Sequence, residues 1–358
     1  MNNKWNYQPP SQEQTEAAKA LAKETGISPV LCKLLLERGI SSAAEAKRFF
    51  RPQLNELHDP FLMKDIDIAV DRLNEAMGRK ERILVYGDYD VDGTTAVALV
   101  YKFLQQFYSN IDYYIPDRYE EGYGVSVKGV DYAYETGVKL IIVLDCGIKA
   151  IKEIAYAKEK GIDFIICDHH VPDDELPPAV AILNAKRPDA TYPYEHLSGC
   201  GVGFKFMQAF AINNGIEFYQ LTPLLDLVAV SVASDIVPIM GENRILTYHG
   251  LKQLNSNPSV GLKAIIDVKE KRETTVEITQ DHIEKIKKYL FMLDLIVNCT
   301  ERHEARAQEE HTVFSQPGMR YSIAKALVYS LKQDEYFQSV SELDKEYIVT
   351  KILDDVKG

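Results

Sequence analysis

The chain has 358 residues, of which 46% are hydrophobic and 26% are charged, and this composition excludes a disordered chain, a collagen and a coiled-coil rod. The formal net charge of −12 disfavours indiscriminate binding of nucleic acid through a broad basic face, but it does not exclude an enzyme that gathers carboxylates around bound cations. No run approaches about 18 consecutive apolar residues and no apolar stretch follows Met1, so we expect a cytoplasmic protein without a membrane span or a signal peptide.

The first 80 residues predict a small helical N-terminal segment. Ser11 is placed to cap the first helix and Gly26 to end it, and Pro52 ends the second helix. In the third helix, apolar residues recur at helical spacing. The predicted helices cover residues 13–23, 43–50 and 67–78.

From residue 81 the pattern changes to strands that alternate with helices. The strands are short and continuously apolar, which is typical of a parallel sheet covered on both faces. We therefore predict an α/β fold with a mostly parallel sheet and helices on both faces, and we expect the ligand site at the carboxyl ends of the strands. The predicted strands cover residues 82–86, 111–115, 139–144 and 163–167, and the predicted helices cover residues 94–107, 127–137, 150–160, 202–213 and 247–254.

The remaining stretches are less regular. Residues 171–198 are rich in proline and predict a long ordered loop, and residues 224–232 are apolar and predict either a helix or a strand. From about residue 268 amphipathic patterns predict a small α-helical tail, with helices at residues 279–297, 320–331 and 341–356. The predicted organisation is a helical N-terminal segment over residues 1–80, an α/β domain over residues 81–267 and the tail over residues 268–358.

The cysteine pattern indicates neither a disulfide framework nor a structural zinc site. The five cysteines are odd in number, are scattered along the chain and form no Cys-x-x-Cys pair. Cys146 and Cys167 each follow an apolar run, so we expect them to be buried thiols at the ends of strands.

Three aspartates, Asp88, Asp90 and Asp92, directly follow the first strand and open the next helix. In an extended segment alternate residues point the same way, so several of these carboxylates face the crevice above the sheet. Like charges this close repel one another unless a cation lies among them, and divalent ions take oxygen ligands. The alternative is an acidic turn that caps a helix. An EF-hand loop fits poorly, because a strand precedes the motif and Leu99 stands where that loop requires glutamate.

Carboxylates and imidazoles also follow later strands. Asp145 follows the third predicted strand, and Asp168, His169 and His170 follow the fourth. One such aspartate alone is often a helix N-cap, and one such histidine pair is often a surface feature, but here three strands of one sheet deliver these groups to one edge. Asp235 lies between apolar segments, where an unpaired charge is costly. Carboxylates with an imidazole fit Mn²⁺ or Mg²⁺ better than zinc, which prefers cysteine and histidine.

At these residues the sequence resembles the DHH phosphoesterase family, in its branch of single-strand-specific exonucleases. Residues 168–170 have the Asp-His-His motif that names the family, and the resemblance covers about residues 25–267. The matching motifs are residues 57–62, 87–93, 118–124, 145–147, 168–170, 198–203 and 233–238.

The resemblance implies two bound ions, Mn²⁺ or Mg²⁺, which serve phosphodiester hydrolysis. It assigns one ion to Asp90 and Asp145. It assigns the other to Asp92, Asp145, His169 and Asp235, so that Asp145 bridges the two ions.

Other residues receive roles around the metals. The resemblance implies that His170 contacts substrate phosphate or the reacting oxygen. It also implies that Asp88 helps to position the metal ligands without binding a metal ion itself. We expect Arg118 to contact phosphate, since guanidinium meets phosphate bidentately. One departure is Tyr86, which stands where many family members have a histidine. Either the first metal has one fewer nitrogen ligand, or Tyr86 serves as a hydrogen-bond partner.

A larger departure lies in the C-terminal part. No Gly-Gly pair occurs in the chain, so the Gly-Gly-His signature of the family's second, cap subdomain is absent, and no sequence of the OB-fold that guides single-stranded DNA follows. Residues 268–358 do not continue the resemblance. We therefore expect a truncated or rearranged gene product, or a shortened family member whose helical tail replaces the cap.

The resemblance implies a 5′→3′ exonuclease that acts on single-stranded DNA in DNA repair and recombination, with impaired processivity in the absence of the cap. Two alternatives stay open. One is a DHH phosphatase or nanoRNase acting on short oligonucleotides, and the other is a catalytically inactive scaffold derived from the family. The scaffold predicts lost ligands, whereas all the expected ligands are present. We expect single-stranded DNA as a partner and no membrane.

Overall fold

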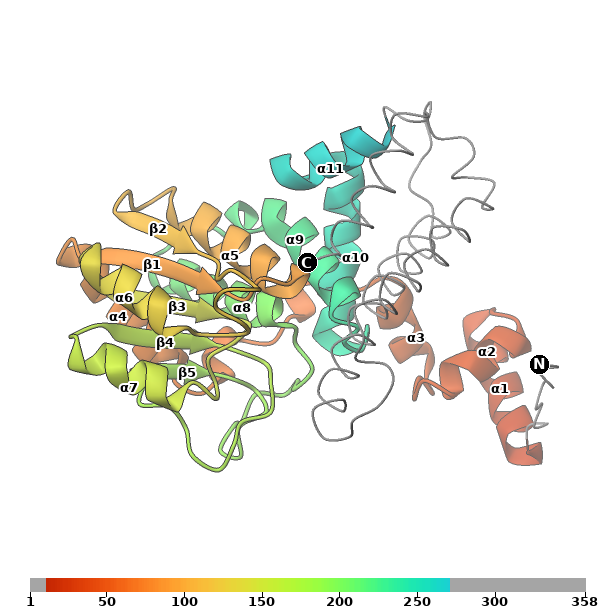
Figure 1. The fold of residues 1–358 in the computed structure, drawn as a ribbon. Coiled ribbons are helices and arrows are strands. Elements are labelled where there is room, and N and C mark those ends of the chain that lie inside the picture. The colour runs from red at the N-terminus through yellow and green to blue at the C-terminus, as the bar shows by residue number, and fades with distance from the viewer. Residues whose placement is uncertain (1–10, 271–358) are drawn as a thin grey trace, which may run out of the picture. The chain divides into compact units, whose positions relative to one another are not determined.

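A computed structural model describes residues 11–270, whose fold Figure 1 shows. The chain divides into two compact units, Met1–Ser259 and Val260–Gly358, and the second contributes one described helix, α11 (Val260–Glu270). The helices predicted in the tail lie outside the described residues. Within the described residues, no helix combines the length and the hydropathy that a membrane span requires.

A five-stranded parallel sheet lies at the centre of the first unit. Its strands are β1 (Arg82–Gly87), β2 (Ile111–Tyr114), β3 (Val138–Leu144), β4 (Asp163–Cys167) and β5 (Ala181–Leu183), in the order β2-β1-β3-β4-β5. Strands β1, β3 and β4 are buried almost throughout, which explains their continuously apolar sequence. The four predicted strands are confirmed. The prediction of an unbroken loop over residues 171–198 is wrong, because the three buried residues of β5 pair with β4.

Helices cover both faces of the sheet, as predicted (Figure 1). The covering helices are α4 (Ile66–Gly78), α5 (Val91–Leu104), α6 (Val127–Glu135), α7 (Ile151–Glu159) and α8 (Gly199–Asn213). Helix α9 (Leu225–Ser234) packs on α5 and α8, and α10 (Gly241–Ser256) packs on α9. Leu84 and Ile141 belong to the apolar cluster under α6 and α7. Their neighbours Ile83 and Leu140 are also buried, and they lie toward α4, α5 and α8 because successive strand residues point to opposite faces.

The N-terminal segment is helical, as predicted, and comprises α1 (Gln12–Thr25), α2 (Pro29–Leu36), α3 (Ala43–Phe50) and two 3₁₀ turns, Leu54–Glu56 and Pro60–Leu62. Ser11 caps α1, which ends at Gly26 with a left-handed φ of 72°, and Ser42 caps α3. The sequence analysis did not predict α2 as a separate helix, although Ser28 caps it and proline occupies its first turn.

Polar caps also explain where two helices of the sheet domain begin. Asp90 caps α5, which starts at Val91 and not at residue 94 as predicted. Ser198 caps α8, which starts at Gly199 and not at residue 202. The ambiguous stretch at residues 224–232 is helical and forms most of α9.

A buried ion pair joins three distant parts of the chain. Lys205 of α8 and Glu242 of α10 are 0% and 1% exposed, and Lys205 Nζ lies 3.1 Å from Glu242 Oε1. Lys205 Nζ also donates to the carbonyl of His58 (2.6 Å), whose backbone N–H donates to Glu242 Oε1 (2.9 Å). The hydroxyl of Tyr192 donates to the other carboxylate oxygen. The pair therefore fixes the segment around residue 58 against α8.

Removing one member of this pair should destabilise the fold strongly, because the other charge would stay buried without a partner. We expect Lys205→Met to lower the free energy of unfolding by about 3–5 kcal/mol, measured by urea denaturation. Lys149 and Asp173 form a matched pair in which both side chains are 57% exposed, so Lys149→Met should cost less than about 1 kcal/mol. Equal losses in the two variants would contradict this account of the buried pair.

Candidate metal centre

The register of the sheet brings three carboxylates to one edge. The last paired residues of β1, β3 and β4 lie opposite one another. Asp88, Asp145 and Asp168 are the next residues in the chain, and each is at most 2% exposed. This is the arrangement that the strand pattern predicts.

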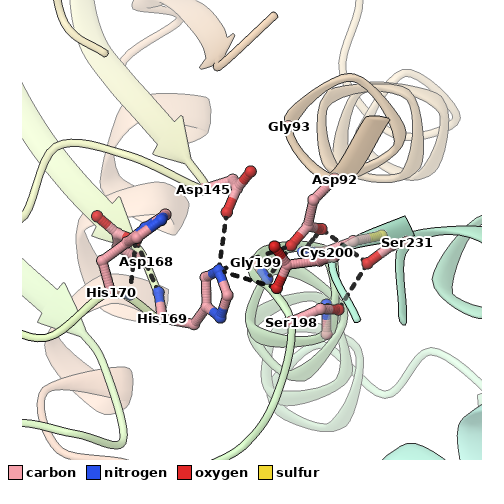
Figure 2. Close-up of polar contacts among 12 residues, drawn as sticks. Asp92, Gly93, Asp145, Asp168, His169, His170, Ser198, Gly199, Cys200 and Ser231 are labelled. Carbon is pink, nitrogen blue, oxygen red and sulfur yellow. Dashed lines mark hydrogen bonds and ion pairs between the residues drawn. The ribbon is translucent and has the colours of Figure 1, made fainter. Parts of the chain in front are cut away.

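The imidazole of His169 lies among several carboxylates, and Figure 2 shows it facing Asp145. Its Nε2 atom is 3.2 Å from Asp145 Oδ1, 3.5 Å from Asp235 Oδ2 and 3.8 Å from Asp92 Oδ2. Ligand atoms of Asp92, His169 and Asp235 lie within 4.8 Å of one another, and so do those of Asp145, His169 and His170. The structure thus brings together Asp92, Asp145, His169 and Asp235, which the sequence analysis assigns to one ion.

The Asp92 carboxylate is held at the N-terminus of α8 (Figure 2). Its Oδ2 accepts a hydrogen bond from Gly199 N (2.7 Å), and its Oδ1 accepts from Cys200 N (2.8 Å) and from the Ser231 hydroxyl (2.7 Å). The Ser231 hydroxyl also lies 2.6 Å from that of Ser198, the N-cap of α8. Backbone N–H groups and the helix dipole favour an anion here, so Asp92 is fixed in position.

Glycine permits close packing around these carboxylates. A Cβ atom at Gly199 would lie 2.4 Å from Asp145 Oδ1, and a Cβ atom at Gly93 would lie 2.4 Å from the backbone oxygen of Asp88. Any larger residue at either position would displace an acidic residue or its backbone. The glycines of these two motifs therefore set the distance between α5, α8 and the sheet edge.

Two of the acidic residues lie at left-handed turns. Asp145 has a φ of 59°, while its backbone N–H still donates to the Cys167 carbonyl (2.9 Å). Asp235 ends α9 and is followed by Ile236, which has a φ of 57°. A β-branched residue rarely adopts this conformation. A strained backbone conformation of this kind persists only where the surrounding packing holds the residue in place.

Asp168 anchors its own loop. Its Oδ1 accepts hydrogen bonds from the backbone N–H groups of His169 (2.7 Å) and His170 (3.1 Å) and lies 2.7 Å from His170 Nδ1, while its Oδ2 accepts from Ile148 N (3.0 Å). Burial opposes its ionisation, but these hydrogen bonds hold the pKa of Asp168 below its ordinary value. The contact with Asp168 raises the pKa of His170. Asp168 therefore orients the His170 ring, a role that the sequence analysis did not assign.

Burial gives the central groups unusual charge states. It raises the pKa of Asp235 to about 7 and that of Asp88 to about 6. Burial and the neighbouring aspartates raise the pKa of Asp145 well above its ordinary value. Burial lowers the pKa of His169 to about 4, so its imidazole is neutral at neutral pH and can offer a lone pair.

Asp145 Oδ1 and His169 Nε2 are among the buried atoms of the described residues that have no hydrogen-bond partner, and they lie 3.2 Å apart. A buried carboxylate oxygen without a partner is costly, and a neutral imidazole nitrogen beside it completes a set of oxygen and nitrogen donors. This donor set fits Mn²⁺ or Mg²⁺.

Three residues of the predicted site lie around this group. Asp90 accepts a hydrogen bond from a backbone N–H in the first turn of α5 (2.9 Å). Among residues 11–270, two groups of side chains bring their possible metal ligand atoms within 4.8 Å of one another, and Asp90 belongs to neither group. Asp88 accepts a long hydrogen bond from Gly124 N (3.4 Å). Arg118 is exposed, and its guanidinium carbon lies 5.3 Å from the centre of the Tyr89 ring.

Two tyrosines organise the loop between β2 and α6. The Tyr86 hydroxyl donates to the Gly124 carbonyl (2.9 Å) and accepts from Ser126 N (3.2 Å), so Tyr86 is a hydrogen-bond partner of this loop. The Tyr123 hydroxyl lies 3.3 Å from His170 Nε2 and 3.4 Å from the Asp145 carbonyl. The sequence analysis did not include Tyr123 in the site, although it lies within the motif at residues 118–124.

The comparison with known families agrees with these motif positions. A family model described as the DHH family, N-terminal domain, matches residues 82–232. Residues 82–232 form a DHH-family domain. This DHH domain contains each of the residues placed above from Asp88 to Ser231, and Asp235 lies three residues beyond its end.

The chain that carries this DHH domain is similar to several exonucleases. It is 39% identical over 278 residues to the single-stranded-DNA-specific exonuclease RecJ of Bacillus subtilis, which covers 76% of this chain and 34% of that protein. It is 36% identical over 253 residues to RecJ of Escherichia coli, covering 68% of this chain and 43% of that protein. A crystal structure of exonuclease RecJ bound to manganese is similar with a TM-score of 0.57 and 28% identity, over 78% of this chain and 71% of that one. The chain thus spans less than half the length of these curated relatives.

Asp145→Asn should stabilise the metal-free DHH domain and weaken its response to metal. The substitution removes a buried negative charge that opposes folding, and it also removes a candidate ligand. In EDTA we expect the variant to have a higher melting temperature than wild type. We expect its affinity for Mn²⁺ to be at least about 10–100-fold lower, because a loss of this size is typical even when the mutated residue only hydrogen-bonds to a metal ligand. Calorimetry with and without Mn²⁺ measures both, and Asp174→Asn, at an exposed site, should behave as wild type. A full Mn²⁺ response in Asp145→Asn would show that Asp145 is not a ligand.

The stability of the metal-free protein should fall as the pH rises from about 6.5 to about 8.5. Burial raises the pKa of Asp235 to about 7, so the folded chain keeps a proton that the unfolded chain has lost, and this stabilisation disappears as the pH passes through that value. His170, whose pKa is raised by Asp168, acts in the same direction. The lowered pKa of His169 makes stability rise with pH, but only near and below the ordinary pKa of histidine, so it does not offset the decline in this interval. We expect the melting temperature in EDTA to decline over this pH interval, and to decline less in Asp235→Asn. A wild-type melting temperature that does not change with pH would refute the raised pKa values of Asp235 and His170.

Proposed function

We propose that this chain is a Mn²⁺- or Mg²⁺-dependent phosphodiesterase that degrades single-stranded DNA from its 5′ end. The observation that carries the proposal is the convergence of Asp92, Asp145 and Asp235 on the neutral Nε2 of His169 at the carboxyl edge of the sheet. Carboxylates and an imidazole in this arrangement suit metal-assisted phosphoryl transfer. Burying them destabilises the metal-free fold, and a structural role alone gives no reason for that cost.

Similarity to known exonucleases supports the substrate class. The two curated relatives are single-stranded-DNA-specific exonucleases, and the solved structure at 28% identity is an exonuclease bound to manganese. The chain spans 34% and 43% of the curated relatives, so DNA specificity, the 5′→3′ direction and a role in DNA repair and recombination are parts of this proposal. We also propose that the protein acts in the cytoplasm.

Two metal positions that share Asp145 form part of the proposal. Asp90 and Asp145 would hold one ion, and Asp92, Asp145, His169 and Asp235 would hold the other. Asp90 would use Oδ2, since its Oδ1 caps α5. Bound divalent ions supply an acidified water and stabilise the charge on the leaving oxygen.

The remaining residues of the site bind and orient the substrate phosphate. His170 is held at Nδ1 by Asp168, and its raised pKa favours a proton on Nε2, the atom next to Tyr123. In this proposal that N–H donates to a phosphate oxygen. Arg118, which is exposed, contacts phosphate through its guanidinium, and Asp88 supports the ligands from behind.

Hydrolysis of 5′-phosphorylated single-stranded DNA with Mn²⁺ tests the proposed function. The full chain should release nucleotides from the 5′ end. Asp145→Ala should slow the reaction by at least about 10³-fold, or ~4 kcal/mol of barrier, because it removes the shared ligand. Asp174→Asn should keep the wild-type rate.

Two outcomes would contradict this proposal to different extents. Cleavage of a dinucleotide but not of longer DNA would refute the DNA substrate and leave a phosphodiesterase for short oligonucleotides. A folded chain that binds Mn²⁺ and cuts neither substrate would refute the phosphodiesterase activity itself.

A further inference from the structure

A polar hollow of about 540 Å³ lies where the chain leaves β5. It is lined by side chains between residues 185 and 196. Among these, Lys186, Arg187 and His196 are basic and Glu195 is the one acidic residue. None of them belongs to the proposed metal site.

Asn184 fixes this hollow next to the loop of residues 168–170. The last residue of β4 pairs with the last residue of β5, so Asn184 stands beside Asp168 at the carboxyl edge of the sheet. Asn184 is fully buried, its Nδ2 donates to the carbonyl of His170 (2.8 Å), and its Oδ1 accepts from Lys186 N (2.7 Å). One buried amide therefore ties the backbone of Lys186 to the backbone of His170.

Lys186 brings a positive charge to this edge. It is half-buried, and its ammonium group forms no ion pair with any residue between 11 and 270. Its neighbour Arg187 is engaged by both Asp65 and Asp189. Burial raises the pKa of Asp235 to about 7, and Lys186 is among the cations that oppose this rise, so the charge of Lys186 acts on the metal site.

The opposite wall of the hollow is tied to the segment that follows Asp235. The Tyr194 hydroxyl donates to the Pro238 carbonyl (3.0 Å). Asn243 Nδ2 donates to the carbonyls of His196 (2.6 Å) and Pro238 (3.1 Å). The hollow therefore lies between the edge of β5 and the turn that carries Asp235, flanking the proposed metal site.

We propose that this hollow binds a backbone phosphate of the substrate strand next to the phosphodiester that is cut, with Lys186 as its main contact. The inference rests on the proposed function, because it assigns a neighbour of the phosphate held at the metal site. A chain of net charge −12 needs local cations to hold a polyanion. Contacts to phosphate position a strand without reading its sequence, which suits degradation of DNA of any sequence.

The salt dependence of binding tests this contact without hydrolysis. Binding of the full chain to a fluorescein-labelled oligothymidylate is measured by anisotropy at several NaCl concentrations, with Ca²⁺ in place of Mn²⁺. Loss of one phosphate contact lowers the slope of log K against log salt by about 0.7 for a single strand. We expect this loss in Lys186→Ala and a wild-type slope in Lys186→Arg. Lys139→Ala removes an exposed charge at the opposite end of β3 and should bind as wild type.

Neutral methylphosphonate linkages, placed one at a time near the 5′ end, then locate the phosphate. At one linkage beside the cut bond, the neutral group should weaken binding by wild type and by Lys139→Ala but not by Lys186→Ala. An unchanged slope in Lys186→Ala, an equal change in Lys139→Ala, or no binding of DNA by wild type would overturn the proposal. Failure of the proposed function would appear instead as DNA that binds with these properties and is not hydrolysed.

Discussion

Repulsion among buried carboxylates is the constraint on which the rest of this structure depends. Three aspartates approach Nε2 of His169 to between 3.2 and 3.8 Å, and burial raises the pKa of Asp235 to about 7 and that of Asp145 well above its ordinary value. Without a cation such a group opposes folding. The neutral His169 supplies a nitrogen donor rather than a counter-charge, so the arrangement suits a bound divalent ion and not an internal ion pair.

Separate parts of the fold hold these groups together against their repulsion. The sheet register delivers Asp145 and the loop of residues 168–170, and the N-terminus of α8 fixes Asp92. Lys205 lies on the same helix α8 and ties it, through Glu242, to the segment around residue 58. The segment around residue 58 thus contributes to the site through α8, because it helps to set the position of the helix whose N-terminus holds Asp92.

The sequence predicted the sheet edge well, since a continuously apolar strand places its next residue at a known position. Asp145 and Asp168 follow from this rule alone. The partners of Asp92 could not be predicted in this way, because Ser231 lies 139 residues away in a helix and a serine there carries no periodic signal. Strand β5 has three residues, too few for a pattern, and Lys186 beyond it was therefore missed. The role of Asp90 depends on the orientation of its side chain, which the spacing of the motif does not determine.

Anomalous diffraction from crystals of the full chain soaked in Mn²⁺ tests the central claim most directly. The account predicts a manganese peak within about 2.5 Å of an oxygen of Asp145 and within coordination distance of His169 Nε2. Asp145→Asn crystals should lose this peak. A wild-type map with no manganese between Asp145 and His169, or with manganese bound only at places away from Asp145, would contradict the claim that a divalent ion offsets the repulsion among these carboxylates.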